Sequence, residues 1–316
     1  MRTVLIIVHP VLEEASKVAA TFATDLRRAG LGIRMLDSEA EALRTAGFED
    51  AEIVAAGQGA AAGCELAVVF GGDGTILRAA ELCRGTDTPV LGVNLGHVGF
   101  LAEADVEDIH EVVRGVVDRT WTVEERLTLD VSVTVGGEVV ATNWALNEAS
   151  VEKAARERML ELVVEIDARP VSRWGCDGVV CATPTGSTAY NFSAGGPIVW
   201  PEVQALLLVP ISAHALFARP LVVSPEATMA IEVVGELSTG VLWCDGRRAA
   251  DLPVGARVEV VRGRETVRLA RLLTAPFADR LVRKFDLPVT GWRGSAERRN
   301  PGGGAGAGAA DDTGGD

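Results

Sequence analysis

Long apolar runs are missing from this chain of 316 residues. No stretch approaches the roughly 18 uninterrupted apolar residues that a membrane-spanning helix requires. The apolar run near the N-terminus covers only Val4–Val8, and no small-residue cleavage site follows it. It therefore predicts a buried first strand rather than a signal peptide, and we expect a cytoplasmic protein without a membrane partner.

Cysteine is scarce as well, with five residues scattered along the chain, no CxxC pair and an odd total. This spacing argues against a disulfide framework and against a structural zinc site, so we expect reduced, mostly packed thiols. The four histidines are equally scattered and show no metal-ligand spacing. The sequence therefore identifies no metal ligands.

Positive charge is in deficit, with 30 Lys and Arg against 44 Asp and Glu and a formal net charge of −14. Sequence-independent binding of nucleic acid depends on neutralising phosphates, so we expect no nucleic-acid partner. A small phosphate-bearing ligand is compatible with this charge if local dipoles, a few basic side chains and divalent cations hold it. The same acidity also favours solubility whether or not a ligand binds.

The first third of the chain alternates strand-like and helix-like patterns. The strand-like segments are 2–9, 32–36, 65–70 and 89–94, and the helix-like segments are 13–29 and 76–83. Short, nearly all-apolar strands separated by helices are typical of a parallel sheet covered on both faces. We expect a Rossmann-like α/β domain over residues 1–120.

From about Trp121 the pattern changes to short β segments separated by Gly, Pro and Asp. These segments are 127–135, 160–167, 178–182, 229–234, 241–244, 258–262 and 267–273. They predict an all-β, sandwich-like second domain over residues 121–277. Residues 278–285 look helical, and we expect the segment 278–294 to return to the first domain. Residues 295–316 almost lack large apolar side chains, which predicts a disordered tail.

The string GGDGT, residues 71–75, is the strongest local signal. It follows an apolar strand and precedes a helix, an arrangement in which backbone N–H groups and the helix dipole favour an anion. Its glycines remove the Cβ atoms that would block a close approach. Asp73 would repel a phosphate unless it binds a cation or accepts a proton, which indicates phosphoryl transfer. The alternative is a tight turn in which Asp73 caps the helix.

Two further segments carry polar groups that suit a nucleotide. In Gly175–Gly196 an apolar strand leads into a hydroxyl-rich loop, TPTGSTAYN, that contains the only tyrosine of the chain, Tyr190. Hydroxyl groups and a helix N-terminus can grip phosphate or ribose oxygens, although a Ser/Thr-capped turn between core elements would look similar. The pair Asn147-Glu148 suits adenine or ribose, but alone it is an ordinary dipeptide.

Together and in this order, these strings resemble the NAD kinase family, in particular the bacterial ATP- or polyphosphate-dependent enzymes. The likeness runs from about Leu66 to Gly294. GGDGT, NLGHVGFLAE at Asn94–Glu103, LNE and especially DGVVCATPTGSTAYNFSAGG carry it. The resemblance implies transfer of a phosphoryl group to the 2′-hydroxyl of the adenosine ribose of NAD, giving NADP. It also implies a divalent cation (Mg²⁺ or Mn²⁺) and a homodimer or homotetramer formed through the β-rich domain.

The resemblance also implies roles for individual residues. Asp73 would be the catalytic base facing the 2′-hydroxyl. The phosphate loop would consist of Gly71, Gly72, Gly74 and Thr75. The residues expected to line the substrate site are Asp73, Gly74, Arg78, Asn147, Glu148, Arg158, Asp177, Thr188, Ala189, Tyr190, Asn191, Phe192, Ser193 and Arg247. Two positions depart from relatives, which carry Asn near Ser212 and in some cases Gln at Arg247. The charge of Arg247 could alter nucleotide preference or pair with a surface carboxylate.

Three other functions remain as alternatives. Lipid and sphingoid-base kinases also carry a GGDGT loop, but the TPTGSTAY loop and the Asn147-Glu148 pair favour a dinucleotide acceptor, and no membrane-binding amphipathic segment is evident. A non-catalytic dinucleotide sensor could dispense with Asp73. A Rossmann-type oxidoreductase fits worse because no GxGxxG follows the first strand.

Overall fold

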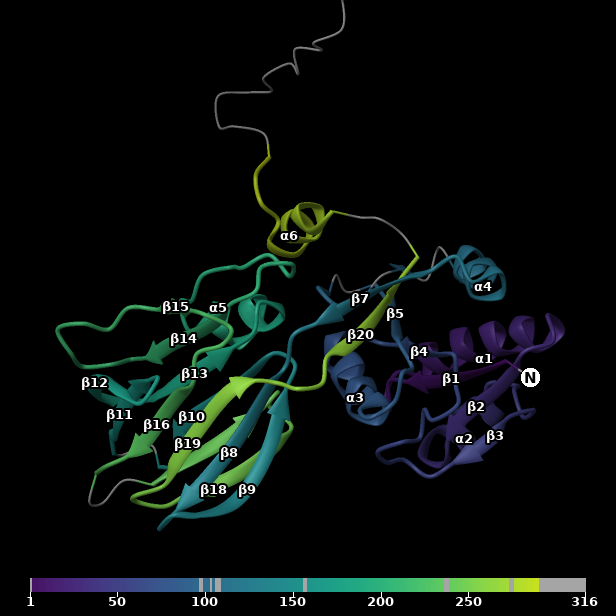
Figure 1. Ribbon diagram of the computed structural model, residues 1–316. Coiled ribbons are helices and arrows are strands. Elements are labelled where there is room, and N and C mark those ends of the chain that lie inside the picture. The colour runs from purple at the N-terminus through teal and green to yellow at the C-terminus, as the bar shows by residue number, and fades with distance from the viewer. Residues whose placement is uncertain are drawn as a thin grey trace, which may run out of the picture.

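The computed structural model consists of an α/β domain beside a β-rich domain (Figure 1). It describes residues 2–96, 99–102, 104–105, 109–155, 158–235, 239–272 and 276–289. This arrangement confirms the predicted fold class. The predicted tail 295–316 and the last residues of the returning segment, 290–294, lie outside the described residues.

The sheet of the first domain is parallel in its centre. Its described strands run in the order β3-β2-β1-β4-β5-β20-β7, and β6 pairs with β5. The N-terminal strands are β1 Thr3–Val8, β2 Gly32–Leu36, β3 Glu52–Val54, β4 Leu66–Phe70, β5 Val90–Asn94 and β6 Ala104–Asp105. Side chains of β1 alternate between the two faces: Val4 and Ile6 join one core cluster, and Leu5 and Ile7 join another. Both faces are therefore covered, as the all-apolar strands predict.

The helices of this domain divide between the two faces. They are α1 Glu13–Arg28, α2 Asp37–Thr45, α3 Asp73–Cys83 and α4 Ile109–Asp118. Helices α1, α2 and α4 contribute to one core cluster, whereas α3 packs Ile76 and Ala79 into the other. Helices α2 and α4 were not expected from the sequence. Helix α2 is mostly polar, and only Ala40 and Leu43 of this helix join the core cluster. Two apolar positions are too few to show a helical period in the sequence.

The second domain is a sandwich of two antiparallel sheets around one core. In the described residues its sheets run β15-β14-β13-β10-β17-β18 and β12-β11-β16-β19-β8-β9. Their bounds are β8 Leu129–Val135, β9 Glu138–Ala145, β10 Glu148–Lys153, β11 Leu160–Ile166, β12 Arg169–Cys176, β13 Gly178–Ala182, β14 Leu206–Ile211, β15 Leu221–Val223, β16 Met229–Val233, β17 Gly240–Cys244, β18 Arg248–Leu252 and β19 Arg257–Arg262. Trp174 and side chains of both sheets fill the space between them.

Two strands that the expected boundaries assign to the second domain lie in the first sheet. They are β7 Thr122–Arg126 and β20 Val267–Arg271. Strand β20 pairs in parallel with β5 and antiparallel with β7. The chain therefore crosses to the second domain after β7 and returns with β20. The physical reason for the difference is that a local β pattern does not encode which sheet a strand will join.

Helix α6, Phe277–Phe285, follows the return of the chain to the first domain and has aromatic contacts with both domains. The rings of Phe277 and Phe285 each lie 5.8 Å from that of Phe100 in the first domain. On the other side, Phe285 lies 4.5 Å from Phe192, and Phe277 lies 5.1 Å from Trp200. The helix thus joins the loop around Phe100 to the hydroxyl-rich loop of the second domain.

Candidate active site

Asp73 is the first residue of α3, directly after the glycine turn that follows β4. Its carboxylate accepts two backbone hydrogen bonds of 3.1 Å, from the Phe100 amide at Oδ2 and from the Leu101 amide at Oδ1. A Cβ on Gly99 would lie 2.4 Å from Asp73 Oδ1, so this close approach requires glycine. The N-cap residue of α3 is Gly72, and the Asp73 carboxylate bonds to the amides of residues 100–101, which favours a role other than capping the helix. The half-buried carboxylate is fixed in direction but still accessible.

The glycines next to Asp73 differ in how much space surrounds them. A Cβ on Gly71 would lie 2.5 Å from Thr75 Oγ1, so Gly71 is tightly packed. On Gly72 or Gly74 a Cβ would meet nothing within 4 Å in the described part of the chain. Gly72 has an ordinary φ of −86°, so conformational strain does not demand glycine there. No side chain at these two positions shields the start of α3, as the approach of an anion requires.

Arg78 lies on α3 but is paired with a carboxylate of another helix. Its Nη1 lies 2.7 Å from Oε1 of Glu39 on α2, and the Glu39 side chain is only 3% exposed. Glu39 Oε2 also accepts a hydrogen bond of 2.9 Å from the Val8 amide at the end of β1. Burial raises the pKa of Glu39, which the hydrogen bond from Val8 and the charge of Arg78 oppose. Arg78 therefore neutralises a buried carboxylate close to the glycine turn, and its predicted ligand contact stays a prediction.

In the second domain, the backbone of Leu146, Asn147 and Glu148 is held by the carboxylate of Asp245. Asp245 Oδ2 accepts from the Leu146 amide at 2.9 Å, and Oδ1 accepts from the Asn147 amide at 2.7 Å and the Glu148 amide at 3.4 Å. Asp245 lies in the turn between β17 and β18, where its φ of 53° and that of 61° at Gly246 are typical of a type I′ hairpin.

The side chains of Asn147 and Glu148 are buried and incompletely satisfied. Each residue is 7% exposed, and neither Asn147 Oδ1 nor Glu148 Oε2 has a hydrogen-bond partner among the described residues. Burial, followed by the charge of Asp245, raises the pKa of Glu148 to about 8. Buried polar atoms without partners are rare in folded proteins, so Asn147 Oδ1 is suited to accept a hydrogen bond from a bound ligand, and the carboxyl of Glu148, protonated at neutral pH, can donate or accept one.

The hydroxyl-rich loop packs directly on this pair. Thr183 donates from Oγ1 to the Leu146 carbonyl at 2.6 Å and from its amide to the Asn147 carbonyl at 2.9 Å. The backbone amide of Tyr190 hydrogen-bonds to the carboxyl of Glu148. Gly186 lies so close that a Cβ would be 2.0 Å from the Asn147 carbonyl oxygen. The structure therefore brings together two motifs that are separated by about forty residues of sequence.

The predicted residues 188–193 fall into two groups. Thr188, Ala189 and Tyr190 are half-buried, while Phe192 and Ser193 are exposed. Asn191 is fully buried, and its amide donates to the carbonyls of Ser187 at 3.2 Å and Pro197 at 3.1 Å. The side-chain amide of Asn191 thus braces the loop from inside.

Two more predicted residues lie around the second domain's polar groups. Asp177 Oδ1 lies 2.5 Å from Lys153 Nζ, and hydrogen bonding from Lys153 lowers the pKa of Asp177. Ser212, which departs from the family pattern, hydrogen-bonds to Asp177 through its side chain. Charge interactions with Asp177 help raise the pKa of Tyr190, which places these two groups near each other. Arg158 is exposed.

Arg247 faces the first domain rather than standing alone at the surface. Its guanidinium donates to both carboxylate oxygens of Glu81 on α3, at 3.0 and 3.1 Å. Of the two roles considered for Arg247, the structure shows the pairing with a carboxylate. Sequence reasoning missed Glu81 and Asp245, since the guanidinium groups that bind Glu81 and the amides that bind Asp245 are 97 to 167 residues away. It also gave no role to residues 99–101, although they belong to the quoted NLGHVGFLAE string.

A short run of contacts links Asp73 to the hydroxyl-rich loop. The Phe100 amide holds Asp73, the Phe100 ring contacts Phe285, and Phe285 contacts Phe192 of the loop. Glu81 and Arg247 form a second connection, between α3 and the turn that carries Asp245. The carboxylate and the nucleotide-binding candidates are therefore parts of one inter-domain region.

Metal-binding and membrane-spanning features are not found in the described residues. No group of three or more His, Cys, Asp or Glu among them is arranged to hold a metal ion. All five cysteines are described, and they are buried and unpaired. No helix in the described segments is long and apolar enough to span a bilayer.

Two family models match the chain. The model for the ATP-NAD kinase N-terminal domain matches residues 4–121, and the model for the ATP-NAD kinase C-terminal domain matches residues 146–272. Among curated proteins, an NAD kinase of Thermobifida fusca is 60% identical over 307 residues, covering 95% of this chain and 94% of that protein. A protein named NAD kinase 2 of Streptomyces coelicolor is 57% identical over 296 residues, covering 93% and 98%.

Solved structures give the same similarity at lower identity. A crystal structure of yeast NADH kinase complexed with NADH is 25% identical, with a TM-score of 0.82, and covers 92% of this chain and 89% of that one. An NAD kinase from Archaeoglobus fulgidus in complex with ATP is 25% identical, with a TM-score of 0.64, and covers 90% and 98%.

Proposed function

The chain belongs to the NAD kinase family, and on that premise we propose that it phosphorylates the 2′-hydroxyl of the adenosine ribose of NAD, with Asp73 as general base. The donor in this proposal is ATP or polyphosphate, and the product is NADP. The lipid-kinase, sensor and oxidoreductase alternatives lose their support, because models of one kinase family match both halves of the chain.

The observation that carries the proposal is the setting of Asp73. Its carboxylate follows an open glycine turn, is held by the amides of Phe100 and Leu101, and is only partly buried. In the reaction the ribose 2′-oxygen forms a bond to the terminal phosphorus of the donor, and the bond from that phosphorus to its bridging oxygen breaks. The hydroxyl proton passes to Asp73, and the leaving group departs with the bridging oxygen.

Recognition of the dinucleotide falls to the second domain. Asn147 Oδ1 is a buried acceptor that suits an amino or hydroxyl donor of the nucleotide, and the protonated carboxyl of Glu148 can donate to or accept from a hydroxyl group. Tyr190 and its neighbours in residues 188–193 would cover the ligand from the loop that packs on this pair. The relatives solved with NADH and with ATP support a site for each of these two ligand classes.

A divalent cation fits the glycine turn only as part of a complex with the donor. Asp73 is the one carboxylate of that turn, and Mg²⁺ in kinases usually binds one or two carboxylates plus phosphate oxygens and water. When bound, Mg²⁺ or Mn²⁺ would neutralise charge on the donor phosphates. The protein's own contribution is the dipole of α3 and the unshielded start of that helix.

The cytoplasmic location and the homodimer or homotetramer that the resemblance implies belong to the same proposal. Fractionation of cells and sedimentation of the purified protein test these two points separately from catalysis. Neither result changes the assignment of Asp73.

The test of the activity uses purified protein with NAD and, in separate reactions, ATP or polyphosphate, each with Mg²⁺. We expect a product whose mass is that of NADP and whose phosphorus resonance shows a 2′-phosphomonoester. A product phosphorylated elsewhere, or no product with either donor, would overturn the proposal. Repeating the reaction with NADH in place of NAD would define which redox form is preferred.

A further inference from the structure

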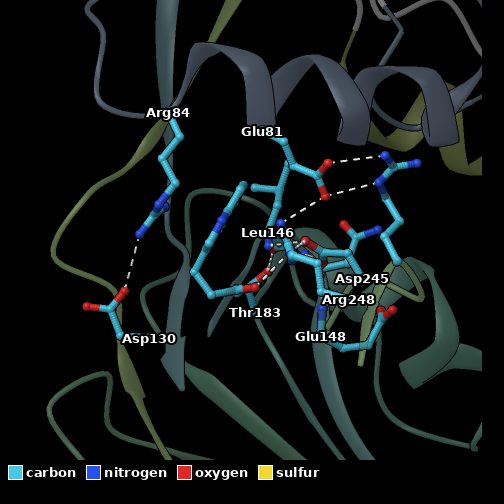
Figure 2. A network of polar contacts seen from close by, with 11 residues as sticks. Glu81, Arg84, Asp130, Leu146, Glu148, Thr183, Asp245 and Arg248 are labelled. Atoms are coloured by element: carbon cyan, nitrogen blue, oxygen red, sulfur yellow. Dashed lines mark hydrogen bonds and ion pairs between the residues drawn. The ribbon is translucent and has the colours of Figure 1, made fainter. Parts of the chain in front are cut away.

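Helix α3 connects the two halves of the proposed site. Its first residue is Asp73, and Glu81, about two turns further on, faces the second domain (Figure 2). Glu81 Oε1 accepts from Arg247 Nε at 3.0 Å and from Arg248 Nη1 at 2.8 Å, and Oε2 accepts from Arg247 Nη2 at 3.1 Å. One carboxylate of the first domain thus binds two guanidinium groups of the second.

Arg248 continues this connection to the backbone that carries Asn147 and Glu148. Its Nη2 donates to Asp245 Oδ2 at 2.9 Å and to the Trp144 carbonyl at 2.8 Å. Asp245, whose side chain is 2% exposed, in turn accepts the three amides of residues 146–148. Unbroken hydrogen bonds therefore run from α3 through Glu81, Arg248 and Asp245 to the nucleotide-binding candidates, as Figure 2 shows.

A second contact of α3 lies beside the first. Arg84, the C-cap of α3, donates to Asp130 on β8 at 3.4 Å. The guanidinium groups of Arg84 and Arg248 lie 4.2 and 4.4 Å from the Trp144 ring, which packs with both. The C-terminal half of α3 is thereby fixed to the second domain at two adjacent points.

We propose that Glu81, Arg247 and Arg248 form an inter-domain latch that positions Asp73 relative to Asn147 and Glu148. This inference rests on the proposed function, because it assigns the base to one domain and the nucleotide contacts to the other. Each motif is complete within its own domain: residues 99–101 hold Asp73, and Asp245 holds residues 146–148. The latch helps to set the distance and angle between them, beside the Arg84 contacts and the aromatic contacts of α6.

The chemistry is sensitive to that distance. Proton transfer to Asp73 requires hydrogen-bond contact with the 2′-hydroxyl, and a misplacement of about 1 Å can lower turnover by about a hundredfold. The stability of the fold is less sensitive, because partly exposed ion pairs contribute little to folding. Glu81 is thus a positioning residue, whose loss should lower kcat more than it raises KM or lowers Tm.

The kinetic experiment compares Glu81→Ala and Glu81→Gln with the wild-type enzyme and with Glu161→Ala. Glu161 pairs with Arg173 at the surface within the second domain, so its variant is a matched control for loss of an ion pair. We expect both Glu81 variants to lower kcat about tenfold, with a change in KM for NAD of less than about threefold. Arg247→Gln, which removes two of the three bonds to Glu81, should give a smaller loss. A kcat within twofold of wild type in Glu81→Ala would overturn the positioning role.

An inter-domain distance measurement decides the latch without any assay of activity. Spin labels on Thr21→Cys in α1 and Glu138→Cys in β9 occupy exposed positions, one in each domain, while the five native cysteines are buried. Glu81→Ala should shift or broaden the distance distribution, and Glu161→Ala should leave it unchanged. An unchanged distribution in Glu81→Ala would overturn the latch even in an active enzyme. If the wild-type chain formed no NADP, the proposed function would fail while this measurement still decided the latch.

Discussion

The two halves of the site use a carboxylate in opposite ways. In the first domain two backbone amides hold the carboxylate of Asp73, which remains half-buried and accessible. In the second domain the carboxylate of Asp245 holds three backbone amides, and the neighbouring side chains of Asn147 and Glu148 are buried with unsatisfied acceptors. The first arrangement presents a charged group for chemistry. The second fixes a buried segment of backbone whose side chains are suited to ligand recognition.

The largest expected effect is that of Asp73→Asn. The asparagine side chain has the size of the aspartate side chain. Its single carbonyl oxygen can accept one of the two backbone hydrogen bonds, but it cannot take a proton from the 2′-hydroxyl. We expect kcat to fall by about 10²–10⁴-fold, with NAD affinity changed little. Steady-state kinetics and calorimetric titration with NAD measure the two quantities. Near-normal turnover would contradict the contrast between the two regions, because the accessible carboxylate of Asp73 would then have no chemical role.

Asp245→Ala tests the other carboxylate through stability and binding. It leaves three backbone amides without their acceptor and leaves Arg248 without one of its partners. We expect the free energy of unfolding to fall by about 2–4 kcal/mol, together with a clear rise in KM for NAD. Urea denaturation followed by fluorescence measures the first effect. Asp73→Asn should show a much smaller loss of stability, and equal losses in both variants would remove the distinction between the two regions.

The buried carboxyl of Glu148 makes stability depend on pH. Its pKa is raised from the usual 4.5 to about 8, so the folded state binds the proton more tightly than the unfolded state. The stability from this group is fully present below pH 4.5 and is lost as the pH rises through about 8. Between pH 4.5 and about 8, wild type loses stability but Glu148→Gln does not. The difference in free energy of unfolding between the two proteins should therefore change by up to about 1.4 kcal/mol per pH unit, in favour of the variant. Denaturation curves at several pH values give this difference, and a pH-independent difference would contradict it.

The sequence predicted the local features of both regions but not their connections. The apolar strands of the first sheet and the hydroxyl-rich loop were recognisable because a short window holds the whole signal. The sheet joined by β20 was not, since its partner β5 lies far away in the sequence. Arg78 and Arg247 were expected at the site from the resemblance, but their ion-pair partners, Glu39 and Glu81, lie on other elements and left no local sign in the sequence.

The smallest predicted effects come from two glycines, one in each region. A Cβ on Gly186 would lie 2.0 Å from the Asn147 carbonyl oxygen, whereas one on Gly74 would meet nothing within 4 Å among the described residues. Gly186→Ala should therefore cost about 1–3 kcal/mol of stability, because the loop and the Asn147 backbone must move apart. Gly74→Ala lies inside α3 and should stabilise the fold by about 0.5–1 kcal/mol, since alanine is the better helix former.

The Gly74 variant also separates the fold from the function. If the open start of α3 serves the donor phosphates, the added methyl group should raise the KM for ATP while the free energy of unfolding increases. The KM for NAD, which depends on the second domain, should change little. A variant that gained stability and kept its KM for ATP would show that the glycine turn is open for a reason other than phosphate approach.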